Sequence, residues 1–311
     1  MRDGAAHVRS GALLLAAGLA AGACTAGPRA RAETGVPSPA PTVKAQAPQP
    51  PPEPVTPPDR SQPPWSRTGV PLLAIGEVER GTFAGGTTWR IGTRRGAVLV
   101  YRPAGYRPHR AGLAVYLHGY FTTVDQAAAD HQLLEQFRKS GRDALFVAPE
   151  APAWNGEESV WTELAPLVQE VLHRTGVTPP AGPVVVAAHS GGYRTMMLWL
   201  GEPRVQELVL LDGFYRGEAE LRAWLESGPA ASKRRLVLLG AETAAPMEAL
   251  AAQVPGALLL PRLPPPATGL DARAREARLL CIRSQQGHMA IVERGEALPL
   301  LLAGGRLPAL R

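Results

Sequence analysis

The 311-residue sequence has little cysteine, histidine or aromatic content: 2 cysteines, 7 histidines and 5% aromatic residues. Cys24 belongs to the N-terminal signal described below, and Cys281 lies in an apolar predicted strand, where we expect a buried thiol. The sequence therefore does not suggest the disulfide framework of small secreted domains. The histidines and cysteines are too dispersed for a metal ligand set, and no glycine-rich loop of the phosphate-binding kind is present. We therefore expect neither a metal nor a cofactor.

A concentrated basic surface is also missing. The formal net charge is +6, but the arginines are scattered along the chain, and no basic helix or aromatic-interleaved basic patch occurs. Such features are the usual marks of nucleic-acid binding. The sequence therefore predicts no nucleic-acid partner.

The first residues have the features of an export signal. Arg2 and Arg9 precede an apolar stretch, residues 11–21, that is too short to span a bilayer as a mature helix. The sequence from Leu19 to Cys24, Leu-Ala-Ala-Gly-Ala-Cys, resembles the lipobox of bacterial lipoproteins. That resemblance implies a signal peptide over residues 1–23, cleavage before Cys24, and attachment of a membrane lipid to the Cys24 thiol.

The lipobox also predicts a location. We expect a lipid-anchored protein of the cell envelope, and a secreted one if Cys24 carries no lipid. Residue 25 is threonine and not aspartate, which by resemblance to Gram-negative lipoproteins favours the outer membrane if the source cell has one.

A proline-rich segment follows the predicted anchor. Residues 28–71 hold 14 of the 32 prolines and almost no periodic apolar pattern, so this segment cannot bury enough surface to fold alone. We predict a disordered tether over residues 24–72 and a single folded domain over residues 73–311. A domain of that length can bury a sizeable core.

The domain alternates strand and helix patterns, which is typical of an α/β fold with a mostly parallel sheet and helices on both faces. The first two predicted strands have no helix between them, which predicts an antiparallel start to the sheet. The predicted strands are 88–93, 97–102, 112–118, 143–148, 183–188, 207–211, 235–240 and 278–283, and the predicted helices are 124–140, 157–174, 191–200, 218–225 and 245–253.

The apolar run of residues 184–188 ends abruptly at His189 and Ser190, and two glycines follow. A serine on a sharp turn between a strand and a helix exposes its hydroxyl above the sheet edge, and the turn requires small neighbours two residues before and after. Ala188 and Gly192 occupy those positions, with alanine where glycine is usual. This pattern predicts Ser190 as a nucleophile.

Two further motifs stand in the required order around Ser190. His118-Gly119 closes an earlier apolar strand, and His288 follows the last predicted strand. With these motifs the chain resembles the α/β-hydrolase superfamily over residues 88 to 305. The resemblance implies that His288 is the general base and that backbone N–H groups of Gly191 and of Tyr120 or Phe121 form the oxyanion hole.

Two carboxylates compete to support His288. Asp212 follows the strand immediately after the nucleophile helix, and Glu242 follows the next strand, where most members of the superfamily place the acid. We favour Asp212 and keep Glu242 as the alternative. The 22 residues between Asp212 and the next predicted strand are too few for a large cap domain.

These residues together predict a serine hydrolase that cleaves an ester or related acyl bond through an acyl-enzyme, without a cofactor. Its substrate would be an acyl-bearing molecule. Two alternatives stand beside it: a peptidase or amidase with the same triad, and an envelope lipoprotein that retains the fold without catalysis.

Overall fold

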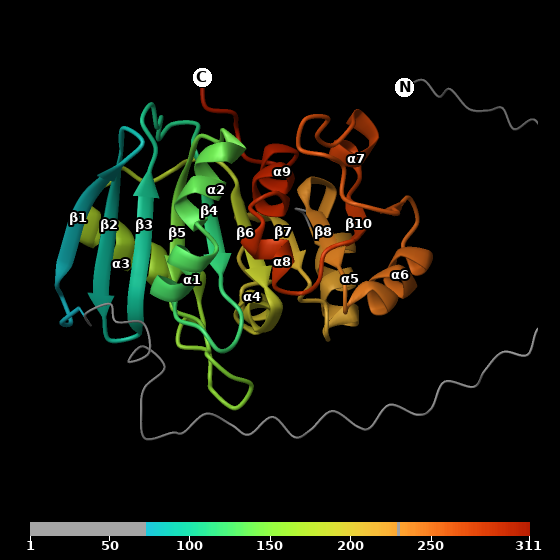
Figure 1. Cartoon of the computed structure of the whole chain (residues 1–311), viewed down its shortest axis with the longest axis horizontal. Helices are drawn as coiled ribbons and strands as arrows, with labels where there is room; N and C mark the ends of the chain where they lie inside the picture. The colour runs from blue at the N-terminus through green and yellow to red at the C-terminus, as the bar shows by residue number, and fades with distance from the viewer. Residues whose placement is uncertain (1–72, 229–230) are drawn as a thin grey trace, which may run out of the picture. The chain divides into compact units, whose positions relative to one another are not determined.

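The computed structural model describes residues 73–228 and 231–311 (Figure 1). The predicted signal peptide, Cys24 and the proline-rich segment lie outside the described residues and stay predictions. No helix within the described ranges is long and apolar enough to cross a membrane.

One ten-stranded sheet organises the domain, in the order β1-β2-β3-β5-β4-β6-β7-β8-β10-β9. β1, β2 and β3 are antiparallel, β3 joins β5 antiparallel, and all the remaining pairs are parallel. The strands are β1 (Val78–Phe83), β2 (Gly86–Thr93), β3 (Gly96–Arg102), β4 (Gly112–Leu117), β5 (Ala144–Pro149), β6 (Val184–His189), β7 (Val205–Leu211), β8 (Arg235–Gly240), β9 (Leu258–Leu260) and β10 (Leu279–Arg283).

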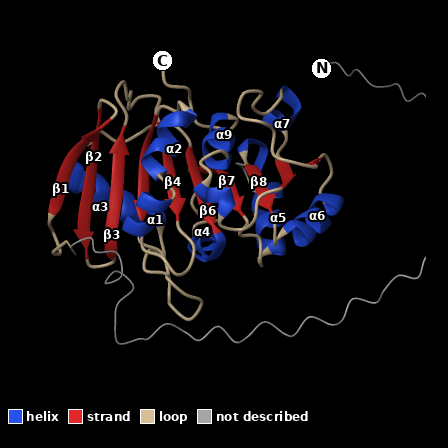
Figure 2. Cartoon of the chain, in the orientation of Figure 1, coloured by secondary structure: helices blue, strands red, loops and turns tan. Residues whose placement is uncertain are grey.

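Helices cover both faces of this sheet (Figures 1 and 2). α3, α4, α5 and α6 pack in one apolar cluster, and α1, α2, α7, α8 and α9 pack in the other. The helices are α1 (Val124–Asp130), α2 (Leu133–Ser140), α3 (Leu164–Thr175), α4 (Tyr193–Leu198), α5 (Glu218–Glu226), α6 (Ala244–Gln253), α7 (Ala272–Glu276), α8 (Ala290–Glu293) and α9 (Ala297–Ala303). The mostly parallel, doubly covered α/β sheet and its antiparallel start are confirmed.

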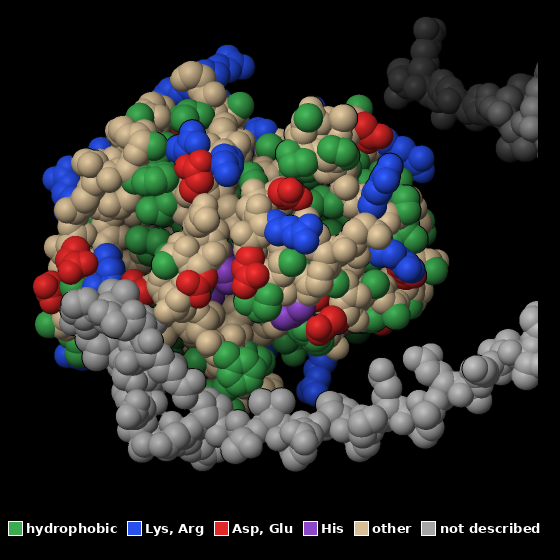
Figure 3. Space-filling view, viewed as in Figure 1, with side chains coloured by type: hydrophobic (Ala, Val, Ile, Leu, Met, Phe, Trp, Pro, Cys, Tyr) green, Lys and Arg blue, Asp and Glu red, His purple; other side chains and the backbone are tan. Residues whose placement is uncertain are grey.

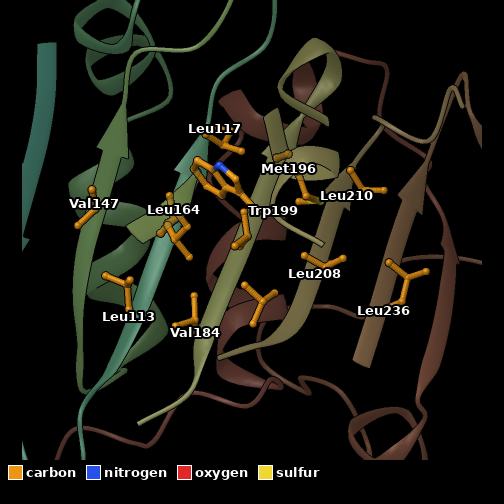
Figure 4. Close-up of a cluster of buried hydrophobic side chains, with 14 of the residues drawn as sticks. Leu113, Leu117, Val147, Leu164, Val184, Met196, Trp199, Leu208, Leu210 and Leu236 are labelled. Carbon is orange, nitrogen blue, oxygen red and sulfur yellow. The ribbon is translucent and has the colours of Figure 1, made fainter. Parts of the chain in front are cut away.

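The strands feed both cores by simple alternation of their side chains. In β6, Val184 and Val186 lie in one cluster and Val185 in the other. Trp199, just after α4, is 2% exposed and lies at the centre of the first cluster (Figure 4), where its Nε1–H donates to the carbonyl of Trp161 at 2.9 Å. β6 is therefore a buried strand with apolar side chains on both faces, and Ser190 follows directly at its carboxyl end.

The sequence missed some elements and misplaced others. β1, β9, α7, α8 and α9 were not predicted. The helix predicted over 124–140 is two helices, because Gln132 adopts a left-handed conformation with φ 50°. The helix predicted from Glu157 begins only at Leu164, and the Glu157 carboxylate instead accepts the Ala153 N–H at 2.7 Å.

The segment between β7 and β8 carries only α5 and the short 3-10 turn Ala231–Lys233. The absence of a large cap domain on this segment is therefore confirmed for the described residues. Cys281 is a buried thiol in β10, as predicted, and burial raises its pKa to about 12.

Candidate active site

Ser190 sits on a strained turn at the end of β6. It has φ 47°, a left-handed conformation that few residues other than glycine adopt. The chain passes from β6 through a single 3-10 turn, Ser190–Gly192, directly into α4. A strained serine between a parallel strand and a helix is the geometry that lifts a hydroxyl out of a sheet edge for nucleophilic attack.

Three glycines allow neighbouring backbone to approach this turn. A Cβ on Gly192 would lie 2.6 Å from the carbonyl oxygen of His118, and one on Gly119 would lie 3.0 Å from Ser190 Cβ. A Cβ on Gly213 would lie 3.0 Å from the carbonyl oxygen of Ser190. Ser190 is therefore enclosed between the chain that leaves β4 and the chain that leaves β7, and it is 9% exposed.

Asp212 is the first residue after β7, and it too has φ 47°. Its side chain is fully buried, and its oxygens accept five hydrogen bonds. Three come from the backbone N–H groups of Ala241, Glu242 and Thr243, one from the Thr243 hydroxyl, and one from His288. These donors satisfy the ionised carboxylate and fix its orientation.

His288 faces this carboxylate. Its Nδ1 lies 2.8 Å from Asp212 Oδ2, and its side chain is 21% exposed. Because an ionised carboxylate only accepts, Nδ1 carries the proton and donates it, which leaves Nε2 of the neutral ring as a proton acceptor. A general base for a serine needs its outer nitrogen in this state.

The two groups shift each other's pKa in opposite directions. Burial alone would raise the pKa of Asp212, but the hydrogen bonds from His288, Thr243 and Ala241 hold it well below its ordinary value. The hydrogen bond to Asp212 raises the pKa of His288 above its ordinary value, against the effect of burial. The charges of Asp212 and Glu242 add to this rise.

Glu242 also reaches this cluster, since β7 and β8 are neighbours in the sheet. One side-chain atom of a kind that can bind a metal, from each of Asp212, Glu242 and His288, lies within 4.8 Å of the other two. The sequence did not predict this cluster as a possible set of metal ligands. The five hydrogen bonds to Asp212 already occupy its oxygens. The hydrogen bonds to Asp212 therefore suit a carboxylate whose task is to orient a histidine, and they suit a metal ligand less well.

The predicted oxyanion groups belong to two chain segments that meet at the serine turn. A Cβ on Gly191 would lie 2.3 Å from the Tyr120 ring, so Tyr120 covers the residue that follows Ser190. The Phe121 N–H has a different partner, because it donates to the carbonyl of Ala153 at 2.6 Å. Of the two predicted donors on this loop, Tyr120 is the one that the backbone geometry favours.

His118 fixes the loop that carries Tyr120. Its Nδ1 donates to the carbonyl of Gly119 at 2.8 Å, and its Nε2 lies 2.9 Å from both Ala151 N and Glu150 Oε1. In a trans peptide the C=O and the following N–H point in opposite directions. The Tyr120 N–H therefore points away from the buried His118 ring.

Aromatic rings lie near Ser190, and one of them, Tyr215, was not predicted. Tyr215 lies beside Tyr193, with ring centroids 5.9 Å apart, and Tyr120 lies beside Phe121 at 6.4 Å. Burial raises the pKa of Tyr215, while a hydrogen bond with the Ser190 side chain opposes that rise. The only signal for Tyr215 in the sequence was its place three residues after Asp212.

Two further polar residues, Asn155 and His131, are held by defined contacts. Asn155 lies in the loop between β5 and α3 and helps to anchor it. Its side chain accepts a hydrogen bond from the Tyr120 hydroxyl at 3.3 Å, and its carbonyl accepts one from Arg194 at 2.9 Å. His131 ends α1 and is buried, at 3% exposure. In Figure 3, histidine side chains reach the surface near α8, beside acidic side chains.

Comparisons with known proteins find similarity in structure alone. No protein-family model and no curated protein sequence matches the chain. An S-formylglutathione hydrolase from Agrobacterium tumefaciens is similar with a TM-score of 0.47 and 11% identity, over 74% of this chain and 99% of the other.

Two further solved structures are of the same kind. An S-formylglutathione hydrolase from Staphylococcus aureus is similar with a TM-score of 0.42 and 9% identity, over 72% and 98% of the two chains. An esterase from Pyrobaculum calidifontis is similar with a TM-score of 0.40 and 16% identity, over 74% and 81%. At these identities and TM-scores, any inference about function has to come from the site itself.

Proposed function

We propose that this protein is a serine hydrolase of the α/β-hydrolase fold that cleaves an ester or related acyl bond. The observation that carries the proposal is the strained Ser190 turn beside a partly buried Asp212–His288 hydrogen bond of 2.8 Å. Neither feature stabilises a fold by itself: a left-handed serine costs about 1–3 kcal/mol, and burying a carboxylate is favourable only when donors surround it. Together they are the parts of a nucleophile and its base.

The reaction follows from the roles of these groups. His288 Nε2 takes the proton of the Ser190 hydroxyl as Oγ attacks the acyl carbonyl, and Asp212 stabilises the imidazolium that forms. The N–H groups of Gly191 and Tyr120 bind the oxyanion of the tetrahedral intermediate. The imidazolium then protonates the leaving group as its bond to the acyl carbon breaks, which leaves the acyl group on Ser190. In the second half, His288 takes a proton from water as the water attacks the acyl carbon, and it returns a proton to Ser190 Oγ as the acid product is released.

We favour Asp212 over Glu242 as the acid. Asp212 is fully buried and bonded to His288 Nδ1 at 2.8 Å, whereas Glu242 contributes its backbone N–H to Asp212 at 3.3 Å and a negative charge near His288. In this role Glu242 increases the basicity of His288 without orienting the ring.

Steady-state hydrolysis tests the proposal. The wild type should hydrolyse p-nitrophenyl acetate or butyrate with a turnover that Ser190→Ala reduces to the rate of the buffer. A wild type without ester turnover would contradict the proposal. Parallel assays with peptide anilides address the amidase alternative, which predicts that anilides are cleaved at a kcat/KM comparable to that of the esters.

The proposal includes the location predicted from the N-terminus: an envelope protein held by lipid on Cys24. Cells fed a clickable fatty acid should incorporate it into the wild type and not into Cys24→Ser. Incorporation into both proteins, or into neither, would contradict the anchor and leave the enzymatic proposal standing.

A further inference from the structure

His189 is the last residue of β6 and directly precedes Ser190. Its side chain is buried, with 2% exposure. A histidine is a costly residue to bury, because its polar nitrogens must find partners. The hydrogen-bond partner of its Nε2 lies in the loop that carries His288.

The first contact is a hydrogen bond to the backbone of the base. His189 Nε2 lies 3.3 Å from the carbonyl oxygen of His288. Because a carbonyl only accepts, Nε2 carries the proton and donates it. β6, which is buried along its whole length, is thus joined directly to a short loop between β10 and α8 that no strand pairing holds.

The second contact is between the two rings. The imidazoles of His189 and His288 have centroids 4.7 Å apart and planes tilted by 36°. This separation is within the range of favourable aromatic pairs. The His189 ring therefore limits the angle that the His288 ring can adopt relative to Asp212.

The His189 ring is held from its other side as well. His131 packs edge-on against it, with centroids 5.9 Å apart, and His131 Nδ1 lies 3.2 Å from the hydroxyl of the buried Tyr116. A Cβ on Gly119 would lie 3.0 Å from His189 Nδ1. His189 accordingly has little freedom to move away from His288.

The groups that face His189 keep it uncharged. Burial, together with the positive charges that His288 and His131 can carry, lowers its pKa to about 3, against smaller opposing effects of the hydrogen bond to the His288 backbone and of the Asp212 charge. Burial likewise lowers the pKa of His131 to about 4. Both rings are neutral when His288 becomes the imidazolium, so neither repels the charge that forms during the reaction.

We infer that His189 is a positioning residue for His288, with its Nε2–H holding the His288 carbonyl and its ring supporting the His288 ring. The inference rests on the proposed function, since it assigns a task to His189 only if His288 is the base. It adds a residue outside the Ser190, His288 and Asp212 set on which the rate should depend. His189 touches no reacting atom in this role.

Two substitutions separate the contacts. His189→Phe keeps a flat ring and removes the donor, whereas His189→Asn keeps a donor and removes the ring. His173→Asn, on the exposed surface of α3, is the matched control. Each protein is titrated with a fluorophosphonate to count its active sites, and kcat, KM and the pH profile of kcat/KM are measured with p-nitrophenyl butyrate.

Both His189 variants should lose about 10- to 100-fold in kcat per titrated site, because small displacements of a catalytic group have effects of this order, while KM changes by less than about 3-fold. The acid limb of kcat/KM should also move to lower pH, because the pKa of His288 is raised first by its hydrogen bond to Asp212, which a displaced ring loses. His173→Asn should match the wild type in every measurement.

The outcomes are distinguishable. If the wild type turns over no ester, the proposed function itself fails. If the wild type is active, and both His189 variants keep its kcat per titrated site and its acid limb, His189 is a packing residue and the inference is overturned. The same conclusion follows if the variants only reduce the number of titrated sites, because that result reports loss of folded protein.

Discussion

At the scale of the residue, two carboxylates lie near one histidine and differ in how they are held. Asp212 has five hydrogen bonds and no exposed surface. Glu242 faces the same histidine as a charge. The difference decides which of them orients the ring of His288 and which only changes its pKa.

Asp212→Asn should therefore reduce kcat by about 10⁴-fold, since an amide in place of the carboxylate favours the wrong tautomer of the base. Glu242→Gln should change kcat by only a few-fold. Ester hydrolysis by the two purified variants gives the comparison. A large loss in Glu242→Gln with a small one in Asp212→Asn would reverse the assignment of the acid.

The pH dependence of activity follows from the raised pKa of His288. The base works only when neutral, so kcat/KM should be low at acid pH and should rise through a midpoint above the ordinary histidine value of 6.5. Glu242→Gln should move this midpoint to lower pH, because the charge of Glu242 raises the pKa of His288. A wild-type midpoint below 6.5 would contradict the geometry of the Asp212–His288 pair.

At the scale of the element, the turn after β6 packs closely against the backbone that leaves β4, and it needs a glycine at position 192 to do so. Gly192 has no Cβ, and the backbone leaving β4 occupies the space where one would be, with the carbonyl oxygens of His118 and Leu117 at 2.6 and 2.7 Å. A backbone cannot move aside as a side chain can.

Gly192→Ala should therefore disturb the turn and lower ester turnover by at least about 10-fold, since a displacement of about 1 Å at a catalytic group has effects of this order. Gly201→Ala is the matched control, because nothing lies within 4 Å of the Cβ position there. Activity and thermal melting of both variants are measured side by side. Equal activity in the two would show that the approach of β4 does not constrain the nucleophile.

The elements that the sequence predicted are those with a strong local pattern. The apolar strands β4 to β8 and the serine turn have patterns that a short window contains. β1 is mostly exposed, β9 has three residues, and α9 is buried on nearly all sides, so none of them shows the alternation or amphipathic spacing from which elements are predicted.

The sequence indicated the residues of the candidate site better than it indicated their arrangement. Ser190 and His288 follow strand ends that the sequence marks clearly. Asp212 and Glu242 follow adjacent parallel strands, and carboxyl ends of parallel strands meet at one edge, so spacing alone could not separate them. The contact of His189 with His288 joins residues 99 apart in the chain, and no local pattern reports it.

At the scale of the whole molecule, one buried ion pair joins the sheet to the C-terminal segment. Arg235 in β8 and Glu207 in β7 form a salt bridge with both side chains fully buried. Glu207 also accepts the Arg306 N–H at 2.7 Å, and Arg235 donates to the carbonyl of Ala274 at 2.9 Å. The pair thereby ties β7 and β8 to α7 and to the chain after α9.

Glu207→Gln should lower the free energy of unfolding by about 3–5 kcal/mol, because it leaves the buried guanidinium without a countercharge. Glu226→Gln removes the partner of Arg222 in a pair whose side chains are 37% and 43% exposed, and it should cost less than about 1 kcal/mol. Urea denaturation of the two variants measures both values. Equal losses would show that the buried pair has no special weight in the fold.

The central claim is that Ser190 is a nucleophile activated by His288. The most direct measurement is labelling of the protein with a fluorophosphonate, followed by peptide mass spectrometry to locate the adduct. The adduct should form on Ser190 in the wild type, should be absent from Ser190→Ala, and should form much more slowly in His288→Ala. An unlabelled wild type, or an adduct on another residue that persists in Ser190→Ala, would contradict the claim.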